Sequence, residues 1–316
     1  MPSVLIFAPA PMLTVTVEDH RGEPDVHLHV GGQGVWQARM LVALGVDVQL
    51  VCTVAGETGR VTRHLLDDES LRVVAIDRDG IGPAYIHDRR GGERIAIVEA
   101  EGEPLSRHAL DALYSATLRE AAGADLVILS GPDGEAMIEA DVYRRLASDM
   151  RELGRPVLVD LADERLAAAL EGGVDVLKVS HEELVADGRV EDGDDEQQLL
   201  AAARALAAEG VGLVAVTRAE AGSIVVDEEG AWRVLAPQLE PVDTLGAGDS
   251  YTAGLASVLA AGGGHALAVR TAAAAGAVNA TRRGLGTGDA EAIRAIAERV
   301  ELQPIPEPDD EREDAR

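Results

Sequence analysis

From residue 105 to about residue 220, helical and strand patterns follow each other in regular alternation. Helices are expected at 106–122, 139–153, 164–171 and 195–209, and the strands between and after them are ADLVILSG, PVLVDL, DVLKVS and GLVAVTRA. These strands are short and almost wholly apolar, as strands are when helices cover both faces of their sheet. The alternation limits the chain to an α/β fold with a mostly parallel sheet between two layers of helices.

Two segments nearer the N-terminus break this alternation. Residues 12–30 alternate apolar and polar side chains around a Gly-Glu-Pro-Asp turn, and residues 84–100 contain two short strand patterns separated by Arg89–Glu93. We expect these two β ribbons to pair as a small accessory sheet. Its apolar side chains are Leu13, Val15, Val17, Ile95 and Ile97. Because a small sheet with an exposed apolar face is marginally stable in water, the ribbons predict a homodimer in which two such sheets pack together.

The charge balance argues against several kinds of partner. The chain has 56 acidic and 28 basic residues among 316, and its formal net charge of −28 repels both a nucleic acid backbone and an anionic membrane surface. Its only lysine is Lys178, so no glycine-rich loop ends in the lysine of a Walker P-loop. The N-terminus lacks a basic segment, and no run of about 18 apolar residues occurs, which predicts a cytoplasmic protein without a membrane segment.

A glycine turn followed by an acidic residue carries the clearest chemical signal. In PVDTLGAGDSYTAGL, the backbone of Gly246, Ala247 and Gly248 can turn tightly and direct several N–H groups toward one point at the start of a helix. This arrangement binds an anion such as a phosphate. Asp249 follows at once, and a carboxylate beside a phosphate repels it unless the carboxylate has a task, such as accepting a proton from an attacking hydroxyl. The alternative is that Asp249 only caps the helix.

The stretch Asp243–Gly254 reads DTLGAGDSYTAG and closely resembles the signature DTxGAGDxxxxG of the PfkB-type, ribokinase-like carbohydrate kinases. The turn Gly31–Gly34, with Ala38 and Arg39 after it, resembles the N-terminal signature of the same family, and the spacing is similar to the 1-phosphofructokinase and tagatose-6-phosphate kinase branch. The resemblance covers nearly the whole chain and implies a three-layer α/β/α core with a small β-sheet lid over a sugar site. The implied divisions are a kinase core of 1–11, 31–83 and 101–303, a lid of 12–30 and 84–100, and an acidic tail of 304–316.

The resemblance also implies a site for ATP and Mg²⁺. It gives Glu183 the task of organising Mg²⁺, places Thr217 and Gly222 near the phosphates, and places Asn279 beside the adenine. Ser180 stands where the family has an asparagine three residues before the glutamate. Taken singly, Glu183 fits a charged helix surface, Thr217 a strand end and Asn279 a helix terminus equally well.

The acceptor site implied by the resemblance departs from the family pattern. The implied sugar contacts are Gly31, Gly32, Gln33, Trp36 and Arg94. Gln33 and Trp36 stand where the branch has lysine and asparagine, and Met12 stands where it has a sugar-binding aspartate. Trp36 either anchors its helix in the core or stacks on the apolar face of a substrate ring. Arg94 is the best candidate to hold a phosphate group on the acceptor. His27 and His29 share one face of their strand and are expected at an exposed or substrate-facing surface rather than at a metal.

The predicted function is ATP-dependent phosphorylation of a hydroxyl group on a sugar or sugar phosphate, with Asp249 as the base. Two alternatives remain open. Loss of the lysine and asparagine also suits a kinase for an unphosphorylated sugar or a nucleoside. A non-catalytic, sugar-binding regulator could keep the same fold, although a mere binder gains nothing from a base beside an anion site.

Overall fold

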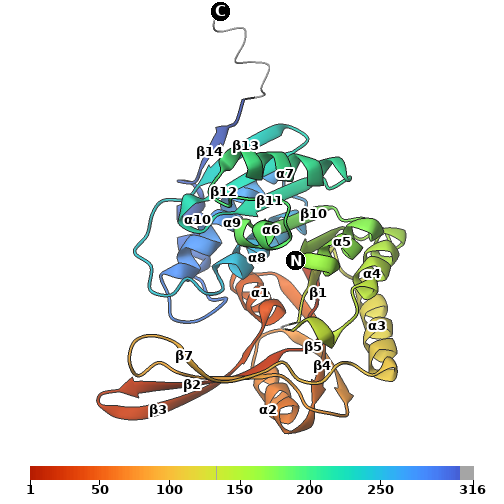
Figure 1. The fold of residues 1–316 in the computed structure, drawn as a ribbon, viewed down its shortest axis with the longest axis vertical. Coiled ribbons are helices and arrows are strands. Elements are labelled where there is room, and N and C mark those ends of the chain that lie inside the picture. Colours follow the sequence, from red (N-terminus) through yellow and green to blue (C-terminus); the bar gives the residue numbers. More distant parts are fainter. Residues whose placement is uncertain (133, 307–316) are drawn as a thin grey trace, which may run out of the picture.

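A ten-stranded sheet forms the centre of the molecule (Figure 1). The computed structural model describes residues 1–132 and 134–306. The strands of this sheet are β1 (Ser3–Phe7), β4 (Asp47–Ala55), β5 (Arg72–Arg78), β8 (Leu126–Ser130), β9 (Val157–Asp160), β10 (Val176–Ser180), β11 (Leu213–Thr217), β12 (Ser223–Asp227), β13 (Gly230–Leu235) and β14 (Glu301–Pro304). Their order is β14-β13-β12-β11-β10-β9-β8-β1-β4-β5. The seven strands β11, β10, β9, β8, β1, β4 and β5 each pair in parallel with their neighbours in this group. Strands β12, β13 and β14 extend the sheet beyond β11 with antiparallel pairs. The predicted mostly parallel sheet is therefore confirmed.

Helices cover both faces of the sheet and enclose two apolar cores. The helices are α1 (Gln33–Ala43), α2 (Gly56–Asp67), α3 (Arg107–Ala121), α4 (Asp141–Glu152), α5 (Asp163–Gly172), α6 (His181–Ala186), α7 (Glu196–Ala208), α8 (Ala247–Leu259), α9 (His265–Ala280) and α10 (Ala290–Ala297). Side chains from α3, α4, α5 and α7 fill one core, and side chains from α1, α8, α9 and α10 fill the other. No helix within residues 1–132 and 134–306 combines the length and the apolar composition needed to cross a bilayer.

The predicted elements agree closely with the structure after residue 105. The four expected helices are α3, α4, α5 and α7, each within two residues of its predicted ends. The antiparallel strands β12, β13 and β14 were not predicted, because they form an edge that interrupts the helix and strand alternation. The acidic tail begins later than predicted: Pro304 pairs with Trp232, and the N–H of Ile305 donates to the carbonyl of Ala231 at 2.8 Å. The rest of the predicted tail, 307–316, lies outside the described residues.

Four strands form a second sheet, which we call the lid sheet. They are β2 (Met12–His20), β3 (Glu23–Gly31), β6 (Ala84–Asp88) and β7 (Ile95–Ala100), in the order β3-β2-β6-β7. The expected pairing of the two ribbons is confirmed, since β2 and β6 run in parallel beside each other. Figure 1 shows the lid sheet projecting from one side of the core. Thr14 and Thr16 of β2 are paired across the sheet with two histidines of β3, which places these polar side chains on one face.

Candidate active site

The glycine turn and Asp249 lie at the start of α8. Gly246 caps this helix with a left-handed backbone at φ 75°, which glycine adopts without strain. The N–H of Ala247 donates to the carbonyl of Thr244 at 3.2 Å, and the N–H of Ser250 donates to the carbonyl of Gly246 at 2.9 Å. The helical hydrogen bonds of α8 therefore begin at Ser250. The amides before it belong to the helix N-terminus, where the helix dipole favours an anion, and Asp249 lies in this first turn.

A network of buried polar side chains lies behind the turn, at the carboxyl edge of the sheet. Lys178 Nζ donates to Asp160 Oδ1 at 2.9 Å, and neither side chain is more than 7% exposed. The second carboxylate oxygen of Asp160 accepts from Thr252 Oγ1 at 2.7 Å and from Gln37 Nε2 at 3.2 Å. Because Thr252 lies in α8, the network joins the ends of β9 and β10 to the helix that carries Asp249.

Lys178 places a positive charge next to the glycine turn. A Cβ added to Gly248 would lie 3.1 Å from Lys178 Nζ, so the turn passes directly over the ammonium group. Burial by itself lowers the pKa of Lys178, but the carboxylates of Asp160, Glu183 and Asp249 outweigh it and raise the pKa. Neither Lys178 nor Asp160 was predicted from the sequence as a site residue. The available signal was a lone lysine inside an apolar strand.

Asn279 connects the glycine turn to the loop that follows α9. Its side chain is 1% exposed. Nδ2 donates to the carbonyl of Leu245 at 2.9 Å, and Oδ1 accepts from the N–H of Thr287 at 3.3 Å. Both polar atoms of Asn279 thus bind backbone groups of this chain, and one of these groups directly precedes Gly246.

We expect Asn279→Ala to lower kcat about tenfold. The turn before Asp249 loses the hydrogen bond from Asn279 to the carbonyl of Leu245, so the reacting groups shift. The free energy of unfolding should fall by about 1–2 kcal/mol, since two hydrogen bonds of the buried Asn279 side chain are lost and its partners, the carbonyl of Leu245 and the N–H of Thr287, are only partly buried. Asn279→Asp still accepts from Thr287 but cannot donate to Leu245, so its effects should be intermediate. Steady-state kinetics and urea unfolding measure both quantities, and an unchanged kcat in Asn279→Ala would contradict the bracing role.

The remaining residues expected near ATP lie at the ends of β10 and β11. Glu183 forms a capping box at the start of α6: its carboxylate accepts from the N–H of Ser180 at 2.7 Å, and its own N–H donates to Ser180 Oγ at 3.1 Å. Thr217 ends β11 directly opposite Ser180. Gly222 has a φ of 80°, and a Cβ there would collide with the carbonyl oxygen of Val234. Glu183 and Gly222 therefore stabilise local structure, and Glu183 also adds negative charge near Lys178.

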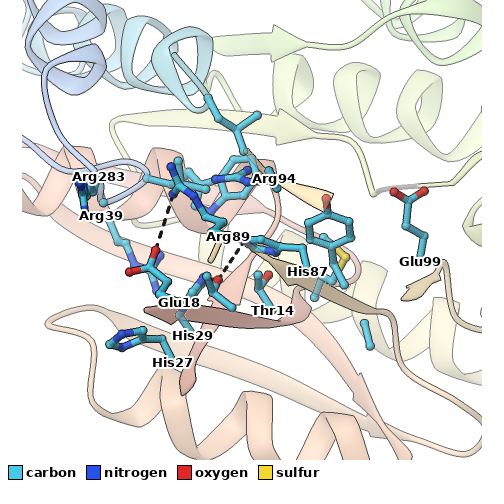
Figure 2. Close-up of a pocket in the computed structure, with 18 of the residues that line it drawn as sticks. Thr14, Glu18, His27, His29, Arg39, His87, Arg89, Arg94, Glu99 and Arg283 are labelled. Atoms are coloured by element: carbon cyan, nitrogen blue, oxygen red, sulfur yellow. Dashed lines mark hydrogen bonds and ion pairs between the residues drawn. The ribbon is translucent and has the colours of Figure 1, made fainter. Parts of the chain in front are cut away.

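A cavity of about 930 Å³ lies between the lid sheet and the core (Figure 2). This volume is typical of sites for small molecules. Of the acceptor residues predicted from sequence, Trp36 and Arg94 line the cavity. Gly31 lies next to Trp36, because a Cβ atom added to Gly31 would be 3.6 Å from the Trp36 ring. Gln33 is directed toward β8, where its Oε1 accepts from the N–H of Gly131 at 2.8 Å.

Four arginines gather on one side of the cavity, and Glu99 lies on the opposite side (Figure 2). They are Arg39, Arg89, Arg94 and Arg283. Asp243, the first residue of the glycine-turn motif, lies 3.2 Å from Arg89 and 3.1 Å from Arg94, so two cations share one carboxylate. Within the part of the chain that the structure describes, Arg283 has no ion-pair partner. Only Arg94 was predicted. Arg39 and Arg283 come from distant points of the chain, and Arg89 was assigned to the turn between the two strand patterns of residues 84–100.

Three histidines also line the cavity: His27, His29 and His87. Thr16 Oγ1 lies 3.1 Å from His87 Nε2 and 3.5 Å from His29 Nε2. Burial, together with Arg39 and the neighbouring histidines, lowers the pKa of His29 to about 4. Burial and the nearby arginines lower the pKa of His87 as well. Both rings are therefore neutral at pH 7 and present uncharged hydrogen-bonding groups.

We expect acidification to destabilise the protein through His29. The pKa of His29 is about 4 in the folded chain and 6.5 in the unfolded chain, so the unfolded chain binds the proton first as the pH falls. The free energy of unfolding should decrease from about pH 6.5 to about pH 4, with His29 contributing about 1–3 kcal/mol. His29→Gln should flatten this part of the profile. Urea unfolding at several pH values measures it, and identical profiles for the two proteins would contradict the assignment.

Comparison with solved structures defines the class of this fold. A mutant form of phosphofructokinase-2 from Escherichia coli matches with a TM-score of 0.83 at 24% identity, covering 95% of this chain and 99% of that chain. A structure described as a possible 1-phosphofructokinase from Thermotoga maritima matches with a TM-score of 0.80 at 21% identity, covering 96% and 100%. At these identities the likeness shows the fold, which is the predicted ribokinase-like α/β fold with its lid sheet.

Curated relatives and a family model give the family. The bifunctional protein HldE of Rhodopseudomonas palustris strain TIE-1 is 31% identical over 284 residues, which cover 88% of this chain and 56% of that protein. The 1-phosphofructokinase of Escherichia coli K12 is 26% identical over 307 residues, covering 91% and 93%. The chain thus spans about half the length of the HldE relatives. The model of the pfkB family carbohydrate kinases matches residues 8–292. This chain belongs to the PfkB family of carbohydrate kinases.

Proposed function

We propose that this protein transfers the γ-phosphoryl group of ATP to a hydroxyl group of a sugar or sugar phosphate. The main support is the position of Asp249, directly after the glycine turn at the start of α8. Leu245, four residues earlier, lines the cavity under the lid sheet, so an acceptor held there lies close to the turn. In this role Asp249 accepts the proton of the attacking hydroxyl, and the N–H groups of Gly246–Gly248 neutralise charge on the transferred group.

On the acceptor side, we propose that Arg94 holds a phosphate group of the substrate. Arg94 and Arg89 share the carboxylate of Asp243, and Arg89 also lies 3.9 Å from Glu18. Arg283 adds a further positive charge on the same side of the cavity. A guanidinium group can bind a phosphate through two parallel hydrogen bonds. The sugar would lie toward Trp36, with the backbone of Gly31, Gly32 and Gln33 at the base of the site.

On the nucleotide side, we propose that ATP binds along the carboxyl edge of the sheet, near Thr217, Gly222 and Asn279. Glu183 is the carboxylate proposed to organise Mg²⁺. One carboxylate is enough for this role, since Mg²⁺ is usually held by one or two carboxylates together with water and substrate phosphates. When bound, Mg²⁺ neutralises charge on the phosphates. The cytoplasmic location predicted from the sequence would supply the ATP.

An ATP-consumption assay with a panel of acceptors tests this function. The panel contains fructose 1-phosphate, tagatose 6-phosphate, fructose 6-phosphate, ribose and nucleosides, and Asp249→Asn serves as the control for contaminating kinases. Turnover of a sugar phosphate supports the proposal together with the role of Arg94. Turnover of ribose or nucleosides alone supports a kinase without a phosphate contact. A protein that binds a sugar but consumes no ATP would be a non-catalytic sugar-binding regulator.

We also propose that the protein is a homodimer joined through the lid sheet. Several apolar side chains of β3 and β7 are between 42% and 60% exposed: Val26, Leu28, Ile95, Ile97 and Val98. An apolar patch of this kind on a four-stranded sheet is unfavourable in water. A second copy of the same sheet, related by twofold symmetry, covers the patch with complementary apolar groups.

Leu28→Asp is expected to convert such a dimer to monomers at micromolar concentration, because the carboxylate would be buried without a partner in the apolar interface. Leu267→Asp is the matched control, since Leu267 is 56% exposed on α9, away from the lid sheet. Light scattering after size-exclusion chromatography gives the mass. A monomeric mass for the unmodified protein would overturn the proposal.

A further inference from the structure

Two ion pairs join the lid sheet to the glycine-turn motif. Arg89 and Arg94 lie in the segment between β6 and β7, and Asp243 is the first residue of that motif, 149 positions after Arg94. Oδ2 of Asp243 lies 3.2 Å from Arg89 Nη1 and 3.1 Å from Arg94 Nη2. The side chains of Arg89, Arg94 and Asp243 are only 17%, 23% and 13% exposed. Water therefore screens these pairs less than it screens ion pairs on an open surface.

The other oxygen of Asp243 holds the main chain that leads into the glycine turn. Oδ1 accepts from the N–H of Leu245 at 3.1 Å, and Leu245 directly precedes Gly246. The main chain of Asp243 is anchored separately, since its N–H donates to the carbonyl of Ala280 at 3.1 Å. One carboxylate thus contacts the lid sheet through Oδ2 and the backbone before the turn through Oδ1. A change at either oxygen alters the geometry at the other, because both belong to one planar group.

The two arginines also compensate a charge that would oppose the site. Asp243 lies three residues before Gly246, so an unpaired carboxylate here would repel an anion bound at the turn. The paired guanidinium groups neutralise this carboxylate, and the amides at the start of α8 keep their attraction for an anion. The geometry of the turn and its charge therefore depend on the same contact.

Arg89 is held more firmly than Arg94. The N–H of Arg89 donates to the carbonyl of Val17 on β2 at 2.8 Å, and its guanidinium group lies 3.9 Å from the carboxylate of Glu18, the next residue of β2 (Figure 2). Within residues 1–132 and 134–306, Asp243 is the sole ion-pair partner of Arg94. Arg89 is thus fixed at its backbone and at its side chain, whereas Arg94 can leave Asp243 for a substrate phosphate without breaking the link to the lid sheet.

We propose that Arg89 is a positioning residue for phosphoryl transfer: through Asp243 it holds the glycine turn in the conformation that the reaction needs. This inference rests on the proposed function, since it gives Arg89 a part in that reaction. In this role Arg89 touches neither ATP nor the acceptor. It affects kcat because it keeps the turn amides and Asp249 aligned, and a misplacement of about 1 Å between reacting groups can slow a reaction about 100-fold.

Arg89→Met removes the charge and keeps much of the length of the side chain. We expect it to lower kcat about three- to tenfold, since Arg94 still pairs with Asp243, and to change the KM for the acceptor less than about twofold. Arg89→Lys restores a positive charge and should recover part of the lost kcat. The matched control is Arg90→Met: Arg90 is the next residue, it pairs with Asp88 at the surface, and its loss should leave kcat and KM unchanged.

A double-mutant cycle tests whether Arg89 acts through Asp243. Asp243→Asn still accepts from the N–H of Leu245 but loses the charge that attracts both arginines, so it should lower kcat at least as much as Arg89→Met. If both variants act through one contact, the combined variant should be no slower than Asp243→Asn alone. Effects that multiply would show that Arg89 acts elsewhere, and they would overturn the inference.

Amide hydrogen exchange, measured by mass spectrometry, reports on the turn without any need for turnover. Exchange in a peptide covering residues 243–250 should become about three- to tenfold faster in Arg89→Met, because the carboxylate that holds the turn loses a charged partner. Exchange in β9 should stay the same, and Arg90→Met should leave both segments unchanged. An unchanged rate at the turn in Arg89→Met, or an equal increase throughout the chain, overturns the inference whatever happens to kcat.

The outcomes separate this inference from the proposed function. If no acceptor is phosphorylated but exchange at the turn rises in Arg89→Met, the proposed function fails and the link from Arg89 to the glycine turn stands. If the protein is an active kinase and Arg89→Met raises the KM for the acceptor at an unchanged kcat, Arg89 is an acceptor contact and the inference alone fails. Unchanged exchange together with no turnover overturns both.

Discussion

Asp249→Asn is expected to reduce kcat at least about 100-fold, the usual contribution of a general base, while the KM for ATP stays within about threefold. Asparagine keeps the size and the hydrogen-bonding capacity of the side chain at the start of α8, so the glycine turn remains in place. It cannot accept the proton of the attacking hydroxyl. The measurement is the ATP-consumption assay with the best acceptor of the panel, at a pH where the aspartate is ionised.

The matched control for this variant is Asp289→Asn. Asp289 lies at the start of another helix, α10, where its Oδ1 accepts from the N–H of Ala292 at 2.8 Å. Asparagine caps a helix about as well as aspartate, so this variant should keep normal kcat and stability. Near-normal turnover by Asp249→Asn would show that Asp249 only caps its helix.

Lys178→Met is expected to lower the free energy of unfolding by about 3–5 kcal/mol, because it leaves the buried carboxylate of Asp160 without its cation. Asp160 is 1% exposed, so water cannot replace the ammonium group. The network that it forms with Thr252 and Gln37 would then carry an uncompensated charge behind the glycine turn. Urea denaturation, followed by circular dichroism, measures the change.

Two controls distinguish the buried charge from a simple loss of packing. Adding Asp160→Asn to Lys178→Met removes the unpaired charge and should recover a large part of the lost stability. Arg90→Met breaks the exposed ion pair with Asp88, and the unfolding midpoint should hardly change, since water screens such pairs. A Lys178→Met protein as stable as the unmodified one would show that the pair contributes nothing.

The central part of the fold could be predicted because its signals are local. The strands β8 to β11 are short apolar runs, and helical patterns lie between them. The fold class and the order of the elements could therefore be predicted from the sequence. The antiparallel strands β12, β13 and β14 escaped prediction because an edge hairpin has no helix partner to mark it. The end of the core was misplaced because Pro304 is part of a strand only through its pairing with Trp232.

For the site, the sequence predicted the residues that belong to one short motif. Gly246, Gly248 and Asp249 were assigned from their spacing, and the structure finds them together at the start of α8. Lys178 and Asp160 were missed although they lie 2.9 Å apart, since 18 residues of chain separate them. They meet because β9 and β10 are parallel neighbours whose carboxyl ends lie at the same edge of the sheet.

The sequence by itself determined the elements, the glycine turn and the family, because backbone freedom and hydrophobic period are properties of residues that are close in the chain. Only the tertiary structure decided which polar side chains line the cavity. Thr14, Trp36 and His87 come from β2, α1 and β6, and their meeting depends on the register of the lid sheet and on the packing of that sheet against the core. A shift of one residue in that register would turn Thr14 and His87 to the opposite face, and no local pattern specifies the pairing of strands so far apart.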